Sequence, residues 1–186
     1  PYLRSTVCVH ETRPEWVVKT NRDAPARAQA FGRDIALEIA SLAALGVVPG
    51  ESDPVACRET VQPEEAAEWI DRALATLGPR DAKLLFPAPA VTFASLAPVL
   101  VSAFSWADRV HYLLVKEEVD YITARHAGLP AREREALAYF IWAGIFPPLD
   151  AMGSPDRGLS RGELVHTLFK ALTASKDLSR RGSVES

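Results

Sequence analysis

The feature that most constrains how this chain can fold is a pair of landmarks that recurs at equal spacing. A Gly-apolar-apolar-Pro stretch occurs at 46–49 (GVVP) and again at 144–147 (GIFP), each after a helical apolar pattern. At the same distance after each glycine, from 46 to 61 and from 144 to 159, an apolar residue opens another helical pattern. Two landmarks that keep one spacing indicate an internal repeat.

Aligning the helix openings brings out three similar segments. They are VQPEEAAEWIDRAL at 61–74, VTFASLAPVLVSAF at 91–104 and LSRGELVHTLFKAL at 159–172. The implied unit is a helix, a glycine stop, a polar loop and a capped helix, and such units bury their apolar faces by packing on one another. The middle copy is degenerate, because the proline-rich stretch LLFPAPA at 84–90 stands where its first helix is expected.

We therefore expect a mainly α fold of three helix-loop-helix units around a pseudo-threefold core, with a short extended N-terminal segment. The expected boundaries are an extended lead-in at 1–23, units at 24–78, 79–128 and 129–176, and a flexible tail at 177–186. The hydrophobic content of 48% is ample for a continuous core. Within the middle unit, one long amphipathic helix is predicted from Trp106 to His126.

Local chemistry explains part of the third opening. Ser160 can accept a hydrogen bond from the amide of Glu163 while the Glu163 carboxylate accepts from the amide of Ser160, which predicts a capping box. Thr92 is predicted to cap the middle helix in a similar way. A capping box makes no demand for an arginine at its second position, so Arg161 needs another explanation, and Gly162 allows a ligand or backbone to approach closely.

The repeat unit resembles the S-layer homology (SLH) repeat of bacterial envelope proteins. The resemblance rests on LAALGVVPG at 42–50, which is similar to the end of the first helix in that family, and on LSRGE at 159–163, which is similar to its Thr-Arg-Ala-Glu opening. The arginine of that opening is present only as Arg161, and Pro63 and Phe93 stand at its place in the other copies. The Asp-Gly-x-Phe loop of the family is missing.

The resemblance implies a non-catalytic, extracytoplasmic module at the cell envelope or cell surface that binds an anionic cell-wall polysaccharide without a cofactor. Arg161, helped by Arg157, would line the binding groove, with the backbone near Gly46 and Gly144 close by. The alternative is a structural or protein-interaction module of a larger envelope protein or enzyme that has lost glycan binding. On that alternative Arg161 is simply a solvated surface arginine.

Other functions find little support in the sequence. A net charge of −3 and a pI near 5.8 argue against a nucleic-acid partner, and no apolar run reaches the roughly 18 residues of a membrane span. Glu163 and His166 form a single E-x-x-H, whereas carboxylate-bridged metal sites need a second copy, so no metal is expected. Nucleophile elbows and phosphate-binding glycine loops are absent from the sequence, and an enzyme is not expected.

Three further groups of residues carry predictions. His111, Glu118 and Arg125 recur at sevenfold spacing and are interpreted as a solvated face of the long helix. Trp69 and Trp142 lie in apolar helical patterns and are expected in the core, although tryptophan rings can also stack on sugars. Cys8 and Cys57 are either two small apolar side chains or one disulfide bridge, and the sequence leaves both open.

Overall fold

The structure is a computed structural model of the chain, and it describes residues 29–49, 56–79 and 83–182. Of residues 177–182 it describes the backbone alone. The predicted lead-in at 1–23, Cys8 and Trp16 lie outside the described residues. Neither alternative for Cys8 and Cys57, a disulfide bridge or two small apolar side chains, is therefore tested, and Cys57 itself is buried.

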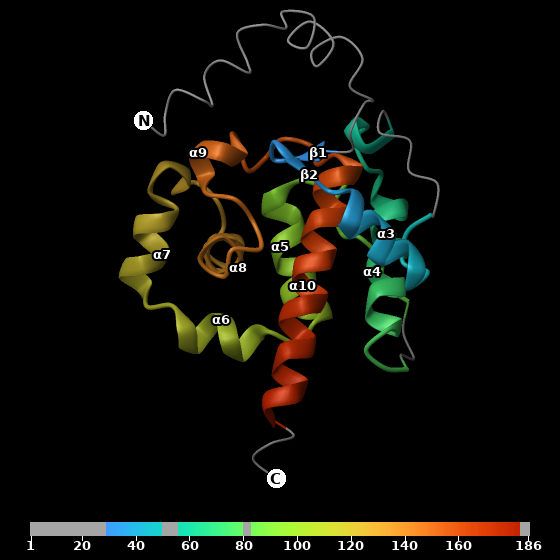
Figure 1. Cartoon of the computed structure of the whole chain (residues 1–186). Helices are drawn as coiled ribbons and strands as arrows, with labels where there is room; N and C mark the ends of the chain where they lie inside the picture. The colour runs from blue at the N-terminus through green and yellow to red at the C-terminus, as the bar shows by residue number, and fades with distance from the viewer. Residues whose placement is uncertain (1–28, 50–55, 80–82, 183–186) are drawn as a thin grey trace, which may run out of the picture.

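The described part of the chain is mainly helical, as predicted, with one small antiparallel hairpin (Figure 1). The hairpin pairs β1 (Gln29–Ala30) with β2 (Arg33–Asp34). The helical elements follow in the order α3 (Ala36–Ala44), η1 (Ala56–Arg58), α4 (Pro63–Ala75), α5 (Phe93–Ala103), α6 (Ala107–Leu113), α7 (Lys116–Ile122), η2 (Ala124–His126), α8 (Ala131–Trp142), α9 (Leu149–Met152) and α10 (Arg161–Gly182).

The two glycine stops end their helices with the same hydrogen bonds. After α3, the amide of Gly46 donates to Ala43 O at 2.9 Å and the next amide to Leu42 O at 2.9 Å. After α8, the amide of Gly144 donates to Ile141 O at 3.1 Å and the next amide to Phe140 O at 2.9 Å. Both are Schellman motifs, in which a residue of positive φ satisfies the last carbonyls of the helix. The apolar pair that follows each glycine is buried: Val47, Val48, Ile145 and Phe146.

The three aligned openings meet in the structure. The amide of Val61 donates to Leu159 O at 2.9 Å, and the amide of Leu159 donates to Val91 O at 2.8 Å. These three residues, which we call the hub, are buried, and each lies immediately before the N-cap of its helix. Figure 1 shows that α4, α5 and α10 run in the same direction from this common end. The alignment thus identified segments that are neighbours in space.

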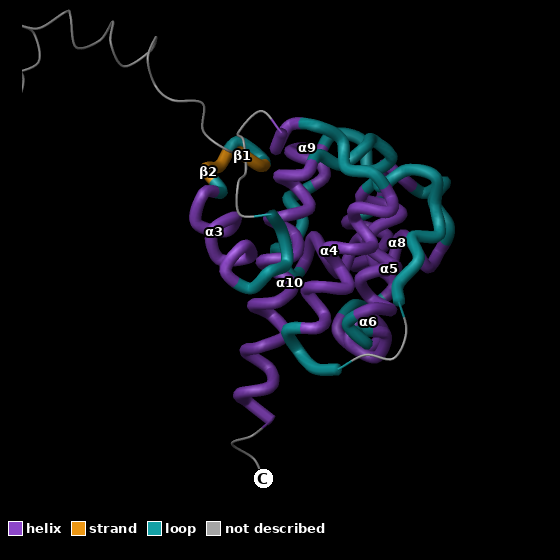
Figure 2. Tube along the Cα trace, turned by 90° about the vertical axis from the view of Figure 1, so that its right-hand side faces the viewer, coloured by secondary structure: helices purple, strands orange, loops and turns teal. Residues whose placement is uncertain are grey.

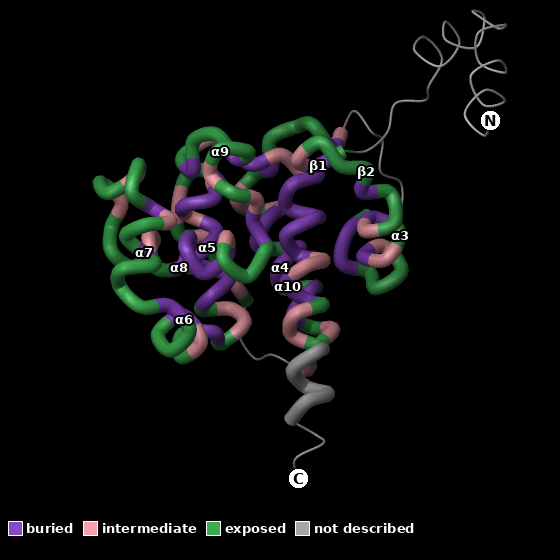
Figure 3. The backbone as a smooth tube through the Cα atoms, turned by 60° about the vertical axis from the view of Figure 1, so that its left-hand side comes forward, coloured by how far each residue is buried: buried purple, intermediate pink, exposed green. Residues whose placement is uncertain are grey.

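One hydrophobic core joins the helices (Figure 3). The helix α10 packs on α3 and α4, while α5 packs on α8 and α4. Figure 2 shows that the far end of α10 projects beyond the other helices, with the β1–β2 hairpin at the opposite end of the molecule. The predicted boundary at residue 176 is not the end of a helix, because α10 continues to Gly182.

The predicted long helix from Trp106 to His126 is wrong, because α6, α7 and η2 stand in its place. The chain is extended at Leu114 and Val115, with ψ values of 128° and 159°. Val119 lies five residues after Leu114, about 140° around a continuous helix, so an unbroken helix would direct the two side chains to different faces. The break buries both side chains, and it places His111, Glu118 and Arg125 on three elements instead of one helical face.

The tryptophan predictions had mixed outcomes. Trp69 is 6% exposed and belongs to the core, as predicted. Trp142 was expected there too, but it is 52% exposed in the last turn of α8, where its ring stacks on Tyr139. The buried residues of α8 are Ala136–Phe140, and Trp142 lies beyond them at the last position of the helix. Trp106, which precedes α6, is buried.

In the described part of the chain, no helix is both long and apolar enough to cross a membrane.

Candidate functional site

The candidate site lies at the opening of α10, where the sequence places Arg161 and Arg157. Both hydrogen bonds of the predicted capping box are present. The amide of Ser160 donates to Glu163 Oε2 at 2.9 Å, and the amide of Glu163 donates to Ser160 Oγ at 3.3 Å. Thr92 and Ser95 form the same reciprocal cap at the start of α5. These caps orient the first turns of α10 and α5 beside the hub.

Arg161 is held by carboxylates of its own chain. Its Nε donates to both oxygens of Glu65 at 2.8 and 3.0 Å, and its Nη1 donates to Glu59 Oε2. The backbone amide of Arg161 also donates to Glu59 O at 2.9 Å. The Arg161 side chain is 30% exposed and that of Glu65 is 23% exposed, so this ion pair is largely shielded from water. It joins the first turn of α10 to the first turn of α4.

Arg157 makes a second set of contacts just before α10. Its Nη1 and Nη2 donate to the two oxygens of Glu163 at 2.9 and 2.5 Å, a bidentate pair. Its Nε donates to Met152 O at 2.8 Å, which ties it to the end of α9. The guanidinium also lies over the ring of Phe93, with its carbon 4.9 Å from the ring centroid. Arg157 therefore links α9, α10 and the start of α5.

The charges of this cluster nearly cancel. Two guanidinium groups face three carboxylates, those of Glu59, Glu65 and Glu163. The hydrogen bond to Glu65 is the main cause that raises the pKa of Arg161, and the hydrogen bond to Glu163 has the same effect on the pKa of Arg157. Because the pKa of each arginine is higher in the folded protein, its ion pair stabilises the fold at any pH below the ordinary arginine pKa. That stabilisation is lost only at a higher pH, where the guanidinium loses its proton. Both arginines thus stay charged and paired at physiological pH.

The two glycines predicted near the ligand groove lie elsewhere. Gly46 and Gly144 are exposed at the ends of α3 and α8, with φ values of 71° and 67°. None of the hydrogen bonds of Arg157 or Arg161 involves them. Their positive φ is sufficient to explain glycine at both positions, because other residues adopt this conformation only at a cost. The hydrogen-bond network of Arg157 and Arg161 thus does not extend to either glycine, and ligand binding by any of the four predicted residues stays a prediction.

Gly162 allows close approach of backbone. A Cβ built on it would lie 3.1 Å from Gln29 O and 3.2 Å from Cys57 O. It would also lie 3.2 Å from Ile35 Cδ1. The first turn of α10 is thus enclosed by β1 and η1. The sequence allowed either a ligand or backbone to approach Gly162 closely, and in the structure it is backbone that does so.

The E-x-x-H of α10 does not form a joint site. Glu163 turns back to Ser160 and Arg157, whereas His166 Nδ1 lies 3.0 Å from Glu38 Oε1 of α3. The His166 ring also makes an edge contact with Phe31. Within the described residues, no group of three or more His, Cys, Asp or Glu side chains could hold a metal ion.

The acidic partners of Arg161 were missed by sequence reasoning. Glu65 and Glu163 both stand at the third position of their helices, so the repeat alignment itself pairs them. The alignment did not show which carboxylate Arg161 binds, because Arg161 contacts Glu65 in a different aligned segment. No sequence pattern singled out Glu59.

Comparisons of the chain with protein-family models, curated proteins and solved structures found no match.

Proposed function

We propose that this chain is a non-catalytic structural or protein-interaction module of an extracytoplasmic envelope protein, built from three SLH-like units. The first unit pairs α3 with α4, the second pairs the non-helical segment at 83–90 with α5, and the third pairs α8 with α10. The hydrogen bonds of the hub and the matching Schellman motifs of α3 and α8 support this arrangement.

The observation that carries the proposal is the ion pair of Arg161 with Glu65. An anionic glycan at Arg161 would have to displace a carboxylate that already makes two hydrogen bonds, and it would meet the further charge of Glu59. Carboxylates repel anions, and the repulsion is stronger where water is partly excluded, as at Glu65. In this chain Arg161 therefore ties the third unit to the first, and the arginine serves cohesion of the module instead of ligand binding.

Arg157 supports the same interpretation at the next junction. The middle copy has Phe93 where the family opening has arginine, yet the Arg157 guanidinium lies over the Phe93 ring. From there it binds Glu163, the third residue of α10, as Arg161 binds the third residue of α4. Arg157, from the loop before α10, thus provides a positive charge beside Phe93, which stands where the family opening has arginine. The third junction has Pro63 and Ser95 at these positions and no arginine.

The test is sedimentation of the purified chain with cell-wall sacculi, either retaining their secondary polysaccharide or stripped of it. We expect equal, background sedimentation with both preparations. We also expect Arg161→Ala to lower the unfolding temperature, whereas Arg125→Ala should not, because Arg125 is an exposed arginine paired only with exposed Asp150. Polysaccharide-dependent sedimentation that is lost in Arg161→Ala and kept in Arg125→Ala would overturn the proposal.

A second candidate, glycan binding at the end of α8, is favoured by one observation. Trp142 lies two residues before the exposed Gly144. Half of the Trp142 surface is exposed, and its ring stacks on that of Tyr139. An exposed aromatic face suits the C–H surface of a sugar ring. The same sedimentation experiment tests it, because this candidate requires polysaccharide-dependent sedimentation that is lost in Trp142→Ala and kept in Arg161→Ala.

A further inference from the structure

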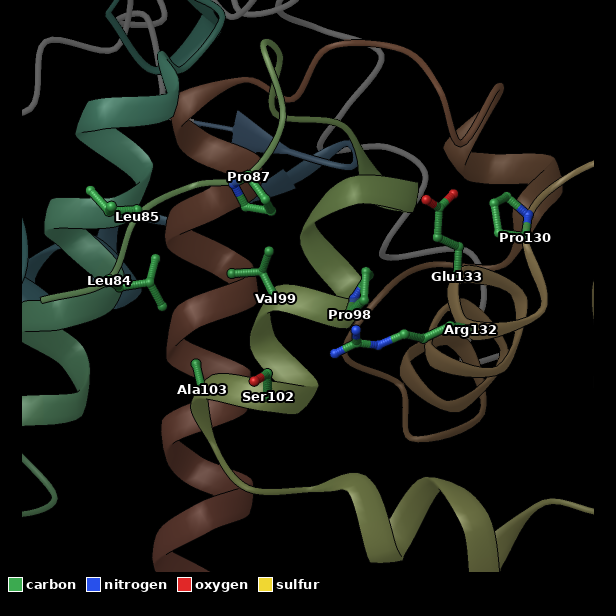
Figure 4. Close-up of a pocket in the computed structure, with 10 residues that line it drawn as sticks. All are labelled: Leu84, Leu85, Pro87, Pro98, Val99, Ser102, Ala103, Pro130, Arg132 and Glu133. Atoms are coloured by element: carbon green, nitrogen blue, oxygen red, sulfur yellow. The ribbon is translucent and has the colours of Figure 1, made fainter. Parts of the chain in front are cut away.

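The segment that precedes α5 is not helical. A full helix precedes α4 and another precedes α10, namely α3 and α8, whereas residues 83–90, ahead of α5, form neither helix nor strand. A helix with its side chains is about 10 Å wide, and a single non-helical chain segment fills less space. Hollows consequently flank the segment on both sides. One of about 420 Å³ lies toward α4, and one of about 440 Å³ lies toward α5 and α8 (Figure 4).

Leu84 and Leu85 form an apolar ridge between these two hollows, since both line each of them. The ridge is held in place, because the amide of Leu84 donates to both carboxylate oxygens of Asp71 at 2.9 and 3.1 Å. Its tip faces water, because Leu85 is 83% exposed. The exposed Leu85 side chain and the hollow beside it give this surface a fixed knob and a recess next to each other.

The hollow toward α5, which we call the α5 groove, has apolar walls and a charged rim. Pro98, Val99 and Ala103 of α5 form one side. Arg132 and Glu133 extend from the start of α8 toward α5 (Figure 4). Among the described residues, the side chains of Arg132, Glu133 and Lys83 make no hydrogen bond or ion pair. The surface therefore carries a knob, a hollow and unpaired charges of both signs.

We propose that this surface binds a second copy of the chain in a two-fold dimer. Leu85 of each copy enters the α5 groove of the other, and Lys83 beside the ridge lies opposite Glu133 on the rim of the groove. A two-fold interface brings the same patch of both copies together, so a patch must complement itself. This patch complements itself, because it carries both Leu85 and the α5 groove, and both Lys83 and Glu133. A partner of one charge would leave a cation or a carboxylate unmatched.

The inference names a partner for the proposed interaction module, and it depends on the α5 surface alone. The test is analytical ultracentrifugation of the chain over a wide concentration range. We expect a concentration-dependent dimer whose dissociation constant rises at least about tenfold in Leu85→Glu, since a buried anchor residue dominates such contacts. The matched control is Leu37→Glu, a leucine of α3 that is 77% exposed and lines neither hollow, and its dimer should be unchanged.

Charge reversal tests the orientation. Lys83→Glu and Glu133→Lys should each weaken the dimer, and the double variant should restore it, because the double exchange re-forms the pair with opposite polarity. Circular dichroism melts establish that each variant folds. A monomer at all concentrations, or a dimer that Leu85→Glu leaves intact, would overturn the inference. Sedimentation with sacculi does not depend on this surface, so failure here is distinguishable from failure of the proposed function.

Discussion

Arg161 at the first position of α10 donates through Nε to both carboxylate oxygens of Glu65, at the third position of α4. The two residues are 96 positions apart in the chain, yet they occupy related places in the aligned segments 61–74 and 159–172. Their contact joins these segments directly, next to the hydrogen bond between Val61 and Leu159.

The coupling between Arg161 and Glu65 should be measurable as a loss of stability. We expect Arg161→Ala and Glu65→Ala to reduce the free energy of unfolding by about 1–2 kcal/mol each, because a hydrogen bond to a charged group contributes about 1.5–3 kcal/mol and partial exposure of this pair lowers that contribution. The double variant should cost less than the sum, since both singles remove the same interaction. Urea unfolding of the four proteins measures the coupling. Strict additivity would show that the pair contributes nothing.

Loss of Arg157 should be more costly, because its partner is more deeply buried. The Glu163 side chain is only 10% exposed, so Arg157→Met leaves a shielded carboxylate without its cation. We expect a loss of about 2–3 kcal/mol, since an uncompensated buried charge is strongly destabilising. Adding Glu163→Gln should recover part of it, because the amide is neutral. The unfolding free energies of the single and double variants provide the check, and a double variant less stable than Arg157→Met would contradict this account.

Gly162 should reject even a methyl group. In a helix, Gly→Ala usually stabilises by about 1 kcal/mol. Here the new Cβ would press on the carbonyl oxygens of Gln29 and Cys57, so we expect Gly162→Ala to destabilise by about 1–3 kcal/mol. Gly128→Ala is the matched control, because nothing lies within 4 Å of a Cβ there and its φ is not positive. Thermal unfolding of both variants distinguishes a crowded site from a general intolerance of alanine.

The two glycine stops should respond alike to substitution. Gly46 and Gly144 have φ values of 71° and 67°, and no atom lies within 4 Å of a Cβ at either. Only the backbone conformation opposes alanine, so Gly46→Ala and Gly144→Ala should each cost about 1–2 kcal/mol. Asparagine should cost less at both positions, because it tolerates this conformation better. Clearly unequal losses in denaturant unfolding would mean that the stops are not equivalent.

The sequence by itself determined where most helices begin and end. The capping box of Ser160 and Glu163, the cap at Thr92 and the stops at Gly46 and Gly144 involve groups only a few residues apart, so their geometry follows from local sequence. The alignment of the helix openings also identified the three segments that meet at the hub. These features depend on backbone hydrogen bonds that each turn must satisfy for itself.

Tertiary structure alone decided what the side chains do. The chain breaks between α6 and α7, where Leu114 and Val119 are both buried, and the exposure of Trp142 follows from which face of α8 meets the core. Arg161 could have faced solvent or a ligand as far as its neighbours in sequence are concerned. Its pairing with Glu65 arises only because packing brings the first turns of α4 and α10 together, and the electrostatic energy of a charge depends on such neighbours.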